Sequence, residues 1–206
     1  MAFGIESGSQ YILDTSIGKN IAAEQAKSAL KASKEAGIYT IASVIVPSPH
    51  DTEETIKETL RFLLDAMPDS VTAQFAILTP HTEWWENPEK YAFHFKDREK
   101  LRKKLMLRNP PTLLPAPLWE RIHYKLNNMS DRDIIKTTGN FIRTIQSHGI
   151  THGMSDFHTI LAISGKNDIK DLKEKSEKAF IEGDMEQITD IVSGINKNIL
   201  KKHNLK

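Results

Sequence analysis

The stretch YTIASVIV, at residues 39–46, is mostly apolar and rich in β-branched side chains. A short run of this composition is typical of a strand that is buried on both faces. Pro47 follows the run and ends the strand, because proline has no N–H to give to a strand ladder. The segments on either side therefore decide how this strand is paired.

A helix is predicted on each side of this strand. Asn20 is a suitable N-cap for a helix over residues 21–36, and Gly37 is a suitable stop. Asp51, with Glu54 three residues later, predicts the start of a second helix. The second helix carries an apolar stripe at Ile56, Leu60, Leu63, Leu64 and Met67.

Two more strands flank these helices, at residues 3–5 (FGI) and 73–78 (AQFAIL). The order is then strand, helix, strand, helix, strand. This order predicts an α/β fold with parallel strands, as part of either an open sheet or a TIM-type barrel. Three strands are too few to close a barrel.

Small and polar residues follow all three predicted strands, at residues 6–9, 48–51 and 79–83. Parallel strands place their carboxyl ends at one edge of a sheet, and α/β folds bind ligands at that edge. We therefore expect Glu6, Ser48 and Thr79 to lie at the edge that carries the functional site.

The chain after residue 83 is predicted to be mainly helical. The basic segment at residues 96–108 has acidic residues among its lysines and an apolar stripe, so we interpret it as a solvated amphipathic helix. Ser130 and Asp184 are suitable caps for two later helices, and a shorter helix is expected at residues 156–164.

Histidines and tryptophans in this region have structural and functional interpretations. His148, His152 and His158 lie near Asp156, but intervening glycines keep them off one helix face, so we favour capping or solvent-facing roles over a metal site. Trp84 and Trp85 suit either a substrate pocket or the packing of the helical region onto the sheet, and we favour packing.

Composition limits the classes of function. The 206 residues contain no cysteine, which excludes disulfides, thiol nucleophiles and Cys-ligated metal clusters within this sequence. The net charge of +1 gives no electrostatic reason to expect nucleic acid or a membrane surface as a partner. Without a run of roughly 20 apolar residues, the sequence predicts no membrane span and a cytoplasmic location.

Several short segments, in order, resemble the radical S-adenosylmethionine (SAM) enzymes, and the cobalamin-binding subclass most closely. They are FGIESGSQ at residues 3–10, ILD at 12–14, GK at 18–19, KEAGI at 34–38, TEET at 52–55 and AQFAILTP at 73–80. These segments resemble the fourth, fifth and sixth strands of the family's barrel with their following loops. The resemblance implies a partial (half) TIM-type barrel of three parallel strands at residues 1–83, followed by an α-helical C-terminal extension at residues 84–206.

The resemblance also implies a cofactor site. Glu6 and Ser7 would bond the ribose and methionine parts of SAM, and Lys19 would pair with the SAM carboxylate. The turn after the fifth strand would contact adenine, through Val46, Pro47, Ser48 and Pro49. No catalytic residue and no metal ligand is assigned in this chain.

Radical SAM enzymes hold a [4Fe–4S] cluster with the three cysteines of a CxxxCxxC motif, and this sequence has none. The resemblance therefore implies a fragment or split subunit that works with a chain carrying that motif, or that self-associates. The implied chemistry is SAM-dependent, with cobalamin-linked methyl transfer, while the [4Fe–4S] cluster and cobalamin are not bound by this chain alone. The alternative is a non-catalytic interaction module, or a non-functional remnant, derived from that family.

Overall fold

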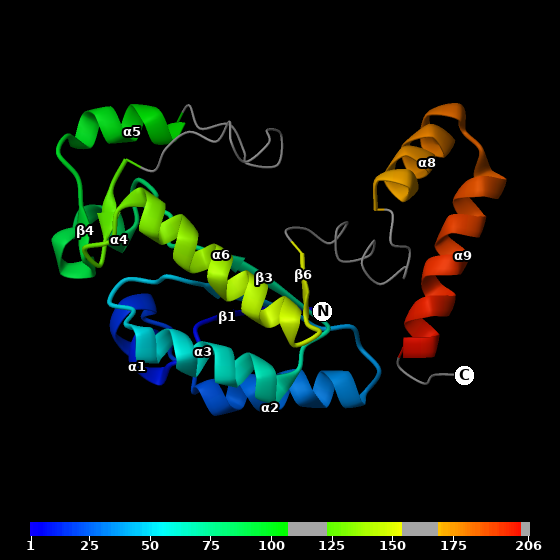
Figure 1. Ribbon diagram of the computed structural model, residues 1–206, viewed down its shortest axis with the longest axis horizontal. Helices are drawn as coiled ribbons and strands as arrows, with labels where there is room; N and C mark the ends of the chain where they lie inside the picture. Colours follow the sequence, from blue (N-terminus) through cyan, green and yellow to red (C-terminus); the bar gives the residue numbers. More distant parts are fainter. Residues whose placement is uncertain (107–122, 154–168, 203–206) are drawn as a thin grey trace.

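A four-stranded parallel sheet forms the centre of the fold (Figure 1). The computed structural model describes residues 1–106, 123–153 and 169–202. The strands lie in the order β1 (Ala2–Glu6), β2 (Ile41–Ile45), β3 (Ser70–Gln74) and β6 (Thr151–His152), and every pair is parallel. The α/β fold with a parallel sheet is confirmed, whereas the partial barrel stays a prediction.

Helices make up most of the remaining described chain. Their bounds are α1 (Gln10–Ile12), the π-helical turn η1 (Leu13–Ile17), α2 (Ala23–Glu35), α3 (Glu53–Ala66), α4 (Glu83–Glu86), η2 (Glu89–Tyr91), α5 (Arg98–Met106), α6 (Asp131–Ser147), α8 (Ile169–Glu182) and α9 (Met185–Lys202). Strands β4 (Phe93–His94) and β5 (Lys125–Leu126) pair antiparallel in a separate small sheet. In the described ranges, no helix combines the length and apolar character needed to cross a membrane.

A buried clamp between Thr40 and Asp69 sets where β2 and β3 begin. One carboxylate oxygen of Asp69 accepts hydrogen bonds from the backbone N and the hydroxyl of Thr40, at 2.9 and 3.1 Å. Ser70 N then donates to the Thr40 carbonyl at 3.1 Å, which brings Ser70 opposite Ile41. The predicted strand at residues 73–78 is therefore wrong in its bounds, because this clamp starts β3 three residues earlier.

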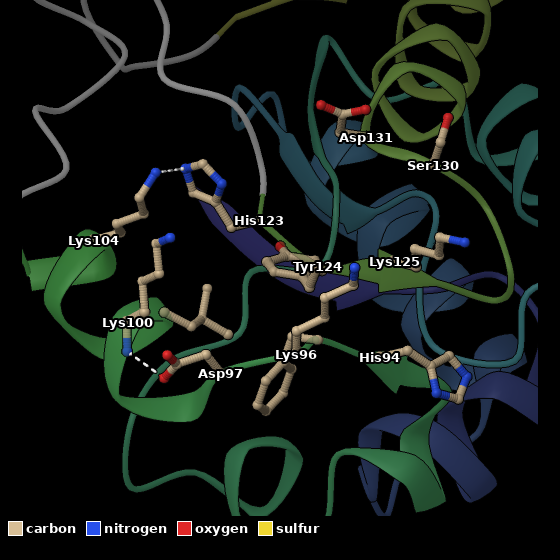
Figure 2. A pocket seen from close by; sticks show the side chains of 12 residues that line it. His94, Lys96, Asp97, Lys100, Lys104, His123, Tyr124, Lys125, Ser130 and Asp131 are labelled. Carbon is tan, nitrogen blue, oxygen red and sulfur yellow. Dashed lines mark hydrogen bonds between the residues drawn. The ribbon is translucent and has the colours of Figure 1, made fainter.

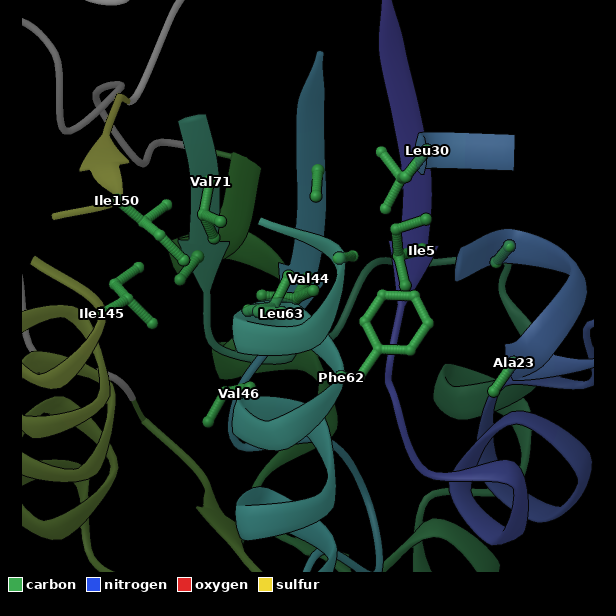
Figure 3. Packing of buried hydrophobic residues seen from close by; sticks show 14 of the residues in the cluster. Ile5, Ala23, Leu30, Val44, Val46, Phe62, Leu63, Val71, Ile145 and Ile150 are labelled. Atoms are coloured by element: carbon green, nitrogen blue, oxygen red, sulfur yellow. The ribbon is translucent and has the colours of Figure 1, made fainter. Parts of the chain in front are cut away.

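Helices α2, α3 and α6 cover one face of the sheet (Figure 3). Alternation along β2 sends Ala42 and Val44 into this layer, where both are fully buried, and leaves Ser43 on the other face. The layer is completed by buried residues of the helices and the neighbouring strands: Ile5, Ala26, Leu30, Phe62, Leu63, Ala66, Val71, Phe141, Ile145 and Ile150. Removal of this apolar surface from water is the main force that holds the helices on the sheet.

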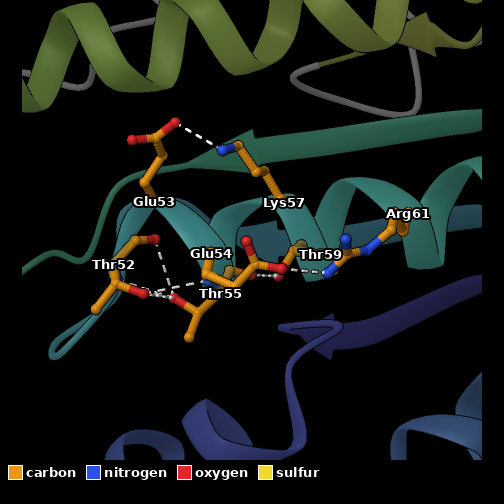
Figure 4. Close-up of polar contacts among 7 residues, drawn as sticks. All are labelled: Thr52, Glu53, Glu54, Thr55, Lys57, Thr59 and Arg61. Atoms are coloured by element: carbon orange, nitrogen blue, oxygen red, sulfur yellow. Dashed lines mark hydrogen bonds and ion pairs between the residues drawn. The ribbon is translucent and has the colours of Figure 1, made fainter.

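The cap of α3 differs from the sequence prediction. Thr52, not Asp51, is the N-cap: its hydroxyl accepts from Thr55 N, and the Thr55 hydroxyl accepts from Thr52 N (Figure 4). The outer face of the helix carries the ion pairs Glu53–Lys57 and Glu54–Arg61. Asp51 is left to bond inward, which gives it a role at the site described below.

The buried stripe of α3 is also rotated from the predicted one. It consists of Thr55, Thr59, Phe62, Leu63 and Ala66, and of these only Leu63 belonged to the predicted stripe. Ile56, Leu60 and Leu64 are half-buried at its margins, and Met67 is exposed in a left-handed conformation that ends the helix. The predicted stripe omitted the two threonines because they are polar, although their hydroxyls are bonded when buried.

Of the four predicted helix caps, two are confirmed, and Asn20 is wrong in addition to Asp51. Ser130 caps α6, accepting from Asp133 N, and the Asp184 carboxylate caps α9, accepting from Gln187 N. Asn20 is not the cap of α2, since that helix begins after Ala22, whose N–H donates to the Gln25 side chain.

The chain after residue 83 contributes more to the sheet than the sequence predicted. It supplies β6, a fourth parallel strand, and it supplies α6 on the helical layer. It also forms a second apolar cluster with Ala76 and Leu78, which follow β3. The expected amphipathic helix is present as α5, whose Leu101 is buried in this cluster. Helix α8, which the sequence analysis did not predict, packs against α9.

Neighbouring leucines of α3 provide a test of this packing. Leu63 is fully buried, so Leu63→Ala should lower the free energy of unfolding by about 2–5 kcal/mol. Leu64 is half-buried, so Leu64→Ala should lower the free energy of unfolding by only about 1 kcal/mol. Urea denaturation followed by circular dichroism measures both, and equal losses would contradict the observed orientation of α3 on the sheet.

Candidate functional site

A carboxylate and an ammonium group lie together at the carboxyl end of β1. Glu6 Oε1 is 3.5 Å from Lys19 Nζ, and both side chains are partly exposed, by 25% and 35%. Lys19 Nζ also donates to the carbonyl oxygen of Gly4. A Cβ on Gly4 would lie 2.6 Å from Glu6 Oε1, so a larger residue there would displace the Glu6 carboxylate from its present position.

Irregular backbone on both sides brings this pair together. The parallel register of β1 against β2 shifts between Gly4 and Glu6, and Glu6 has a φ of 66°. Further along, the π-helical turn η1 ends at Gly18, whose φ of 69° reverses the chain and returns Lys19 to the end of the strand. Bulges, π-helical turns and positive φ values are common at functional sites. Glu6 and Lys19 are therefore candidate ligand-binding residues that the sequence identified and the fold brings together.

The loop after Glu6 is held in place by hydrogen bonds to Thr59 of α3. Thr59 Oγ1 lies 3.1 Å from Ser7 Oγ and accepts from Gly8 N at 3.1 Å. The Ser7 hydroxyl also accepts from Ser9 N at 3.1 Å. Ser7 is buried and bonded within the protein, so in this conformation it positions the loop, and a contact with SAM stays a prediction. The buried Ser9 hydroxyl has no hydrogen-bond partner in the described part of the chain.

The turn after β2 is buried as well. Val46, Pro47, Ser48 and Pro49 are all buried, with a cis peptide bond between Val46 and Pro47. The Ser48 hydroxyl donates to the Ile45 carbonyl at 2.9 Å, and Thr138 of α6 donates to the Val46 carbonyl at 2.8 Å. These groups are used in holding the turn, and their predicted contact with adenine is untested.

Asp51 is the residue of this turn that sequence reasoning assigned to the wrong role. Its two carboxylate oxygens accept from Ser48 N at 2.7 Å and from the Thr55 hydroxyl at 2.6 Å. Burial raises the pKa of Asp51 to about 6, although the bonds from Thr55 and Ser48 act in the opposite direction. The carboxyl group therefore closes the turn onto the start of α3.

Asn127 links the same turn to a segment 77 residues further along the chain. Its Oδ1 accepts from His50 N at 2.7 Å, and its Nδ2 donates to the Ser48 carbonyl at 2.7 Å. His50 Nδ1 lies 3.1 Å from Ser16 Oγ in η1. An asparagine in a turn carries no sequence signal for such a role, so sequence reasoning missed Asn127.

The other residues singled out in the sequence have structural roles. Trp85 is buried in the second apolar cluster, and Trp84 Nε1 donates to the Ser16 carbonyl at 2.8 Å, which fits the favoured packing role. The exposed His148 lies at the end of α6, with Nδ1 2.8 Å from the Thr144 carbonyl. Asp156, His158 and the predicted helix at residues 156–164 lie outside the described residues. Within the described ranges, no three His, Asp or Glu side chains are placed to hold a metal ion.

Comparison with known proteins gives a partial match. No protein-family model matches the chain. A Pyrococcus horikoshii protein described as an uncharacterized methyltransferase is 40% identical over 86 residues, which are 41% of this chain. The chain spans 18% of the length of that protein. The structure of Methanocaldococcus infernus Elp3 with an N-terminal deletion aligns with a TM-score of 0.38 and 16% identity, over 72% of this chain and 36% of that one, which is too distant to support an argument.

Glycine 8 is constrained by α3, and its substitution tests how the loop is anchored. A Cβ on Gly8 would lie 2.5 Å from Phe62 Cβ and 2.8 Å from the backbone Cα of Thr59. Gly8→Ala should therefore lower the free energy of unfolding by about 1–3 kcal/mol. Gly139→Ala is the matched control: it lies within α6 with its nearest neighbour 3.7 Å away, and should stabilise by up to about 1 kcal/mol. Thermal melts measure both, and a neutral Gly8→Ala would contradict the close packing.

The raised pKa of Asp51 predicts a pH-dependent stability. Between its ordinary value of 3.8 and about 6, the folded protein keeps a proton that the unfolded chain has released. The contribution of Asp51 to the free energy of unfolding is therefore full below about pH 4 and is lost as the pH rises through 6. As the pH rises from about 4 to above 6, the free energy of unfolding of the wild type should fall by about 2–3 kcal/mol relative to that of Asp51→Asn.

Urea denaturation of both proteins across this pH range measures the difference. Ile56→Val changes packing on α3, which follows Asp51, without changing a titratable group, and should keep the wild-type pH dependence. An Asp51→Asn variant with the same pH dependence as the wild type would show that Asp51 ionises normally in the folded protein.

Proposed function

We propose that this chain forms part of the SAM and substrate site of a radical SAM methyltransferase, with cobalamin-linked methyl transfer as its chemistry. The observation that carries the proposal is the Glu6–Lys19 pair at the carboxyl edge of a parallel sheet. The 40% identity with a protein described as a methyltransferase supports the reaction class.

The geometry of the pair suits a ligand that carries both hydroxyl groups and a carboxylate. A separation of 3.5 Å is longer than the 2.7–2.9 Å typical of a strong charged hydrogen bond. Such a contact at a partly exposed position contributes little stability, so a ligand can replace it at low cost. Glu6 would accept from the ribose hydroxyls of SAM, and Lys19 would donate to its carboxylate. When bound, SAM would supply an activated methyl group or, after one-electron reduction by the cluster of a partner chain and release of methionine, a 5′-deoxyadenosyl radical.

The residues fit the three cofactors that the resemblance implies unequally. Glu6 and Lys19 fit SAM, and the unpartnered Ser9 hydroxyl lies on the loop that begins beside them. A [4Fe–4S] cluster is not fitted, because the sequence has no cysteine, and no group of three ligating side chains occurs among the described residues. A cluster would have to be supplied by a partner chain carrying CxxxCxxC. No residue is assigned to cobalamin.

Binding of SAM to the isotope-labelled full chain, followed by amide NMR, tests the proposal. Addition of SAM should shift the amide signals of residues 6–9 and Lys19. Lys19→Met should weaken SAM binding about tenfold, because the carboxylate loses its cation. The same variant should bind decarboxylated SAM as the wild type does, since that ligand has no carboxylate.

Lys34→Met is the matched control. Lys34 donates to the Met67 carbonyl at the end of α3, so its removal should leave binding of both ligands unchanged. Two results would favour the alternative, a non-catalytic interaction module or remnant. One is that millimolar SAM shifts no amide signal in the loop, and the other is that Lys19→Met weakens the binding of SAM and of decarboxylated SAM equally.

A further inference from the structure

A cavity of about 630 Å³ lies between α5, the strands β4 and β5 and the start of α6 (Figure 2). It shares no residue with the Glu6–Lys19 site. Its volume falls within the range of about 300–1,000 Å³ that is usual for small-molecule sites. We call it the basic pocket, because its lining includes Lys96, Lys100, Lys104, Lys125, His94 and His123.

The positive charge of the basic pocket is only partly balanced. Its four lysines face two acidic residues, Asp97 and Asp131, whereas the whole chain has nearly equal numbers of basic and acidic residues. Both carboxylates already accept backbone hydrogen bonds, Asp97 from Lys100 N and Asp131 from Arg132 N, each at 2.9 Å. The excess of cations from three separate elements therefore favours a negatively charged occupant.

The ammonium groups of Lys96, Lys100 and Lys125 are available to such an occupant. Among the described residues, Lys96, Lys100 and Lys125 form no ion pair. Lys104 Nζ lies 2.8 Å from His123 Nε2, so this lysine of α5 contacts a residue that precedes β5 (Figure 2). Lysine ammonium groups are strong point-charge donors to phosphate.

The floor of the basic pocket is apolar and aromatic. Phe95, Leu101 and Tyr124 line it, and Leu101 and Tyr124 are buried. The Tyr124 hydroxyl donates to the Ala76 carbonyl at 2.6 Å, which fixes the ring in place. Phe95 is held by stacking on Trp85, with ring centroids 6.0 Å apart. This floor suits a flat apolar group attached to the anion.

The start of α6 forms one wall of the basic pocket and contributes little net charge to it. Ser130 and Asp131 line the pocket at the amino-terminal end of this 17-residue helix, where the helix dipole is positive. Asp131 and Asp133 offset that charge in the first turn. The lysines, rather than the helix end, therefore supply the attraction for an anion.

We propose that the basic pocket binds a small phosphate ester, with its phosphate among the lysines and a flat apolar group on the Phe95–Tyr124 floor. The proposal does not depend on SAM binding, since no residue is shared. A phosphate ester with a flat apolar group would contact both the lysines and the floor. Free phosphate would contact only the lysines, and an uncharged aromatic molecule only the floor.

Three probes distinguish these contributions when titrated into the labelled full chain at about 0.15 M salt. Naphthyl phosphate carries both features, inorganic phosphate only the anion, and naphthol only the ring. Naphthyl phosphate should bind at least about tenfold more tightly than either of the others, and should shift the amide signals of residues 94–101 and 123–131.

Charge-matched double variants provide the controls. The double variant Lys100→Gln, Lys125→Gln removes two cations from the pocket and should weaken the binding of naphthyl phosphate at least about tenfold. Lys103→Gln with Lys136→Gln removes two exposed lysines that do not line the pocket, and should bind it as the wild type does. Unchanged thermal melts of both double variants confirm that each is folded.

Three results would overturn the proposal. Equal losses in the two double variants would show only general attraction to a positive surface. Equal binding of inorganic phosphate and naphthyl phosphate would remove the role of the aromatic floor. Tighter binding of a single-stranded oligonucleotide than of naphthyl phosphate, with equal losses in both double variants, would identify a polyanion-binding surface instead.

Discussion

The packing of α3 against the sheet is the contact on which the rest of the structure depends. The inner face of this helix has two chemically different halves. Its second half is apolar, with Phe62, Leu63 and Ala66 buried on β1 and β2. Its first half presents two hydroxyls: that of Thr55 bonds the Asp51 carboxylate, and that of Thr59 bonds the Ser7 hydroxyl and the Gly8 backbone N–H. One helix therefore both closes the core and fixes the two loops at the carboxyl edge of the sheet.

This arrangement divides the predicted cofactor residues into two groups. Glu6 and Lys19 are partly exposed and loosely paired, so they are free to exchange partners with a ligand. Ser7, Ser48 and the prolines of the turn are buried, and their polar groups serve the fold. Asn127 and Thr138 extend the same support from the later part of the chain. The turn at residues 46–51 is consequently held by side chains from α3, from α6 and from the segment of Asn127.

The later part of the chain is structurally coupled to the sheet. Strand β6 extends the sheet next to β3, α6 shares its core, and the second apolar cluster packs on the residues that follow β3. The Tyr124 hydroxyl, bonded to the Ala76 carbonyl, joins the floor of the basic pocket to that cluster. The two candidate sites thus occupy different elements, and the second apolar cluster reaches the sheet through Ala76 and Leu78, which follow β3.

The sequence by itself determined the parallel α/β order, a central strand within residues 39–46 and the caps at Ser130 and Asp184, because these depend on local composition and local hydrogen bonds. It also identified Glu6 and Lys19, through short segments that resemble a family. Only the tertiary structure decided the start of β3, the buried role of Asp51 and the part played by Asn127. Each of these depends on a hydrogen bond or on burial formed with residues brought close by folding: Asp69 acts on Thr40, and Asn127 acts across 77 residues on His50. Polar residues such as Thr59 likewise have no periodic signal that separates a buried, bonded hydroxyl from an exposed one.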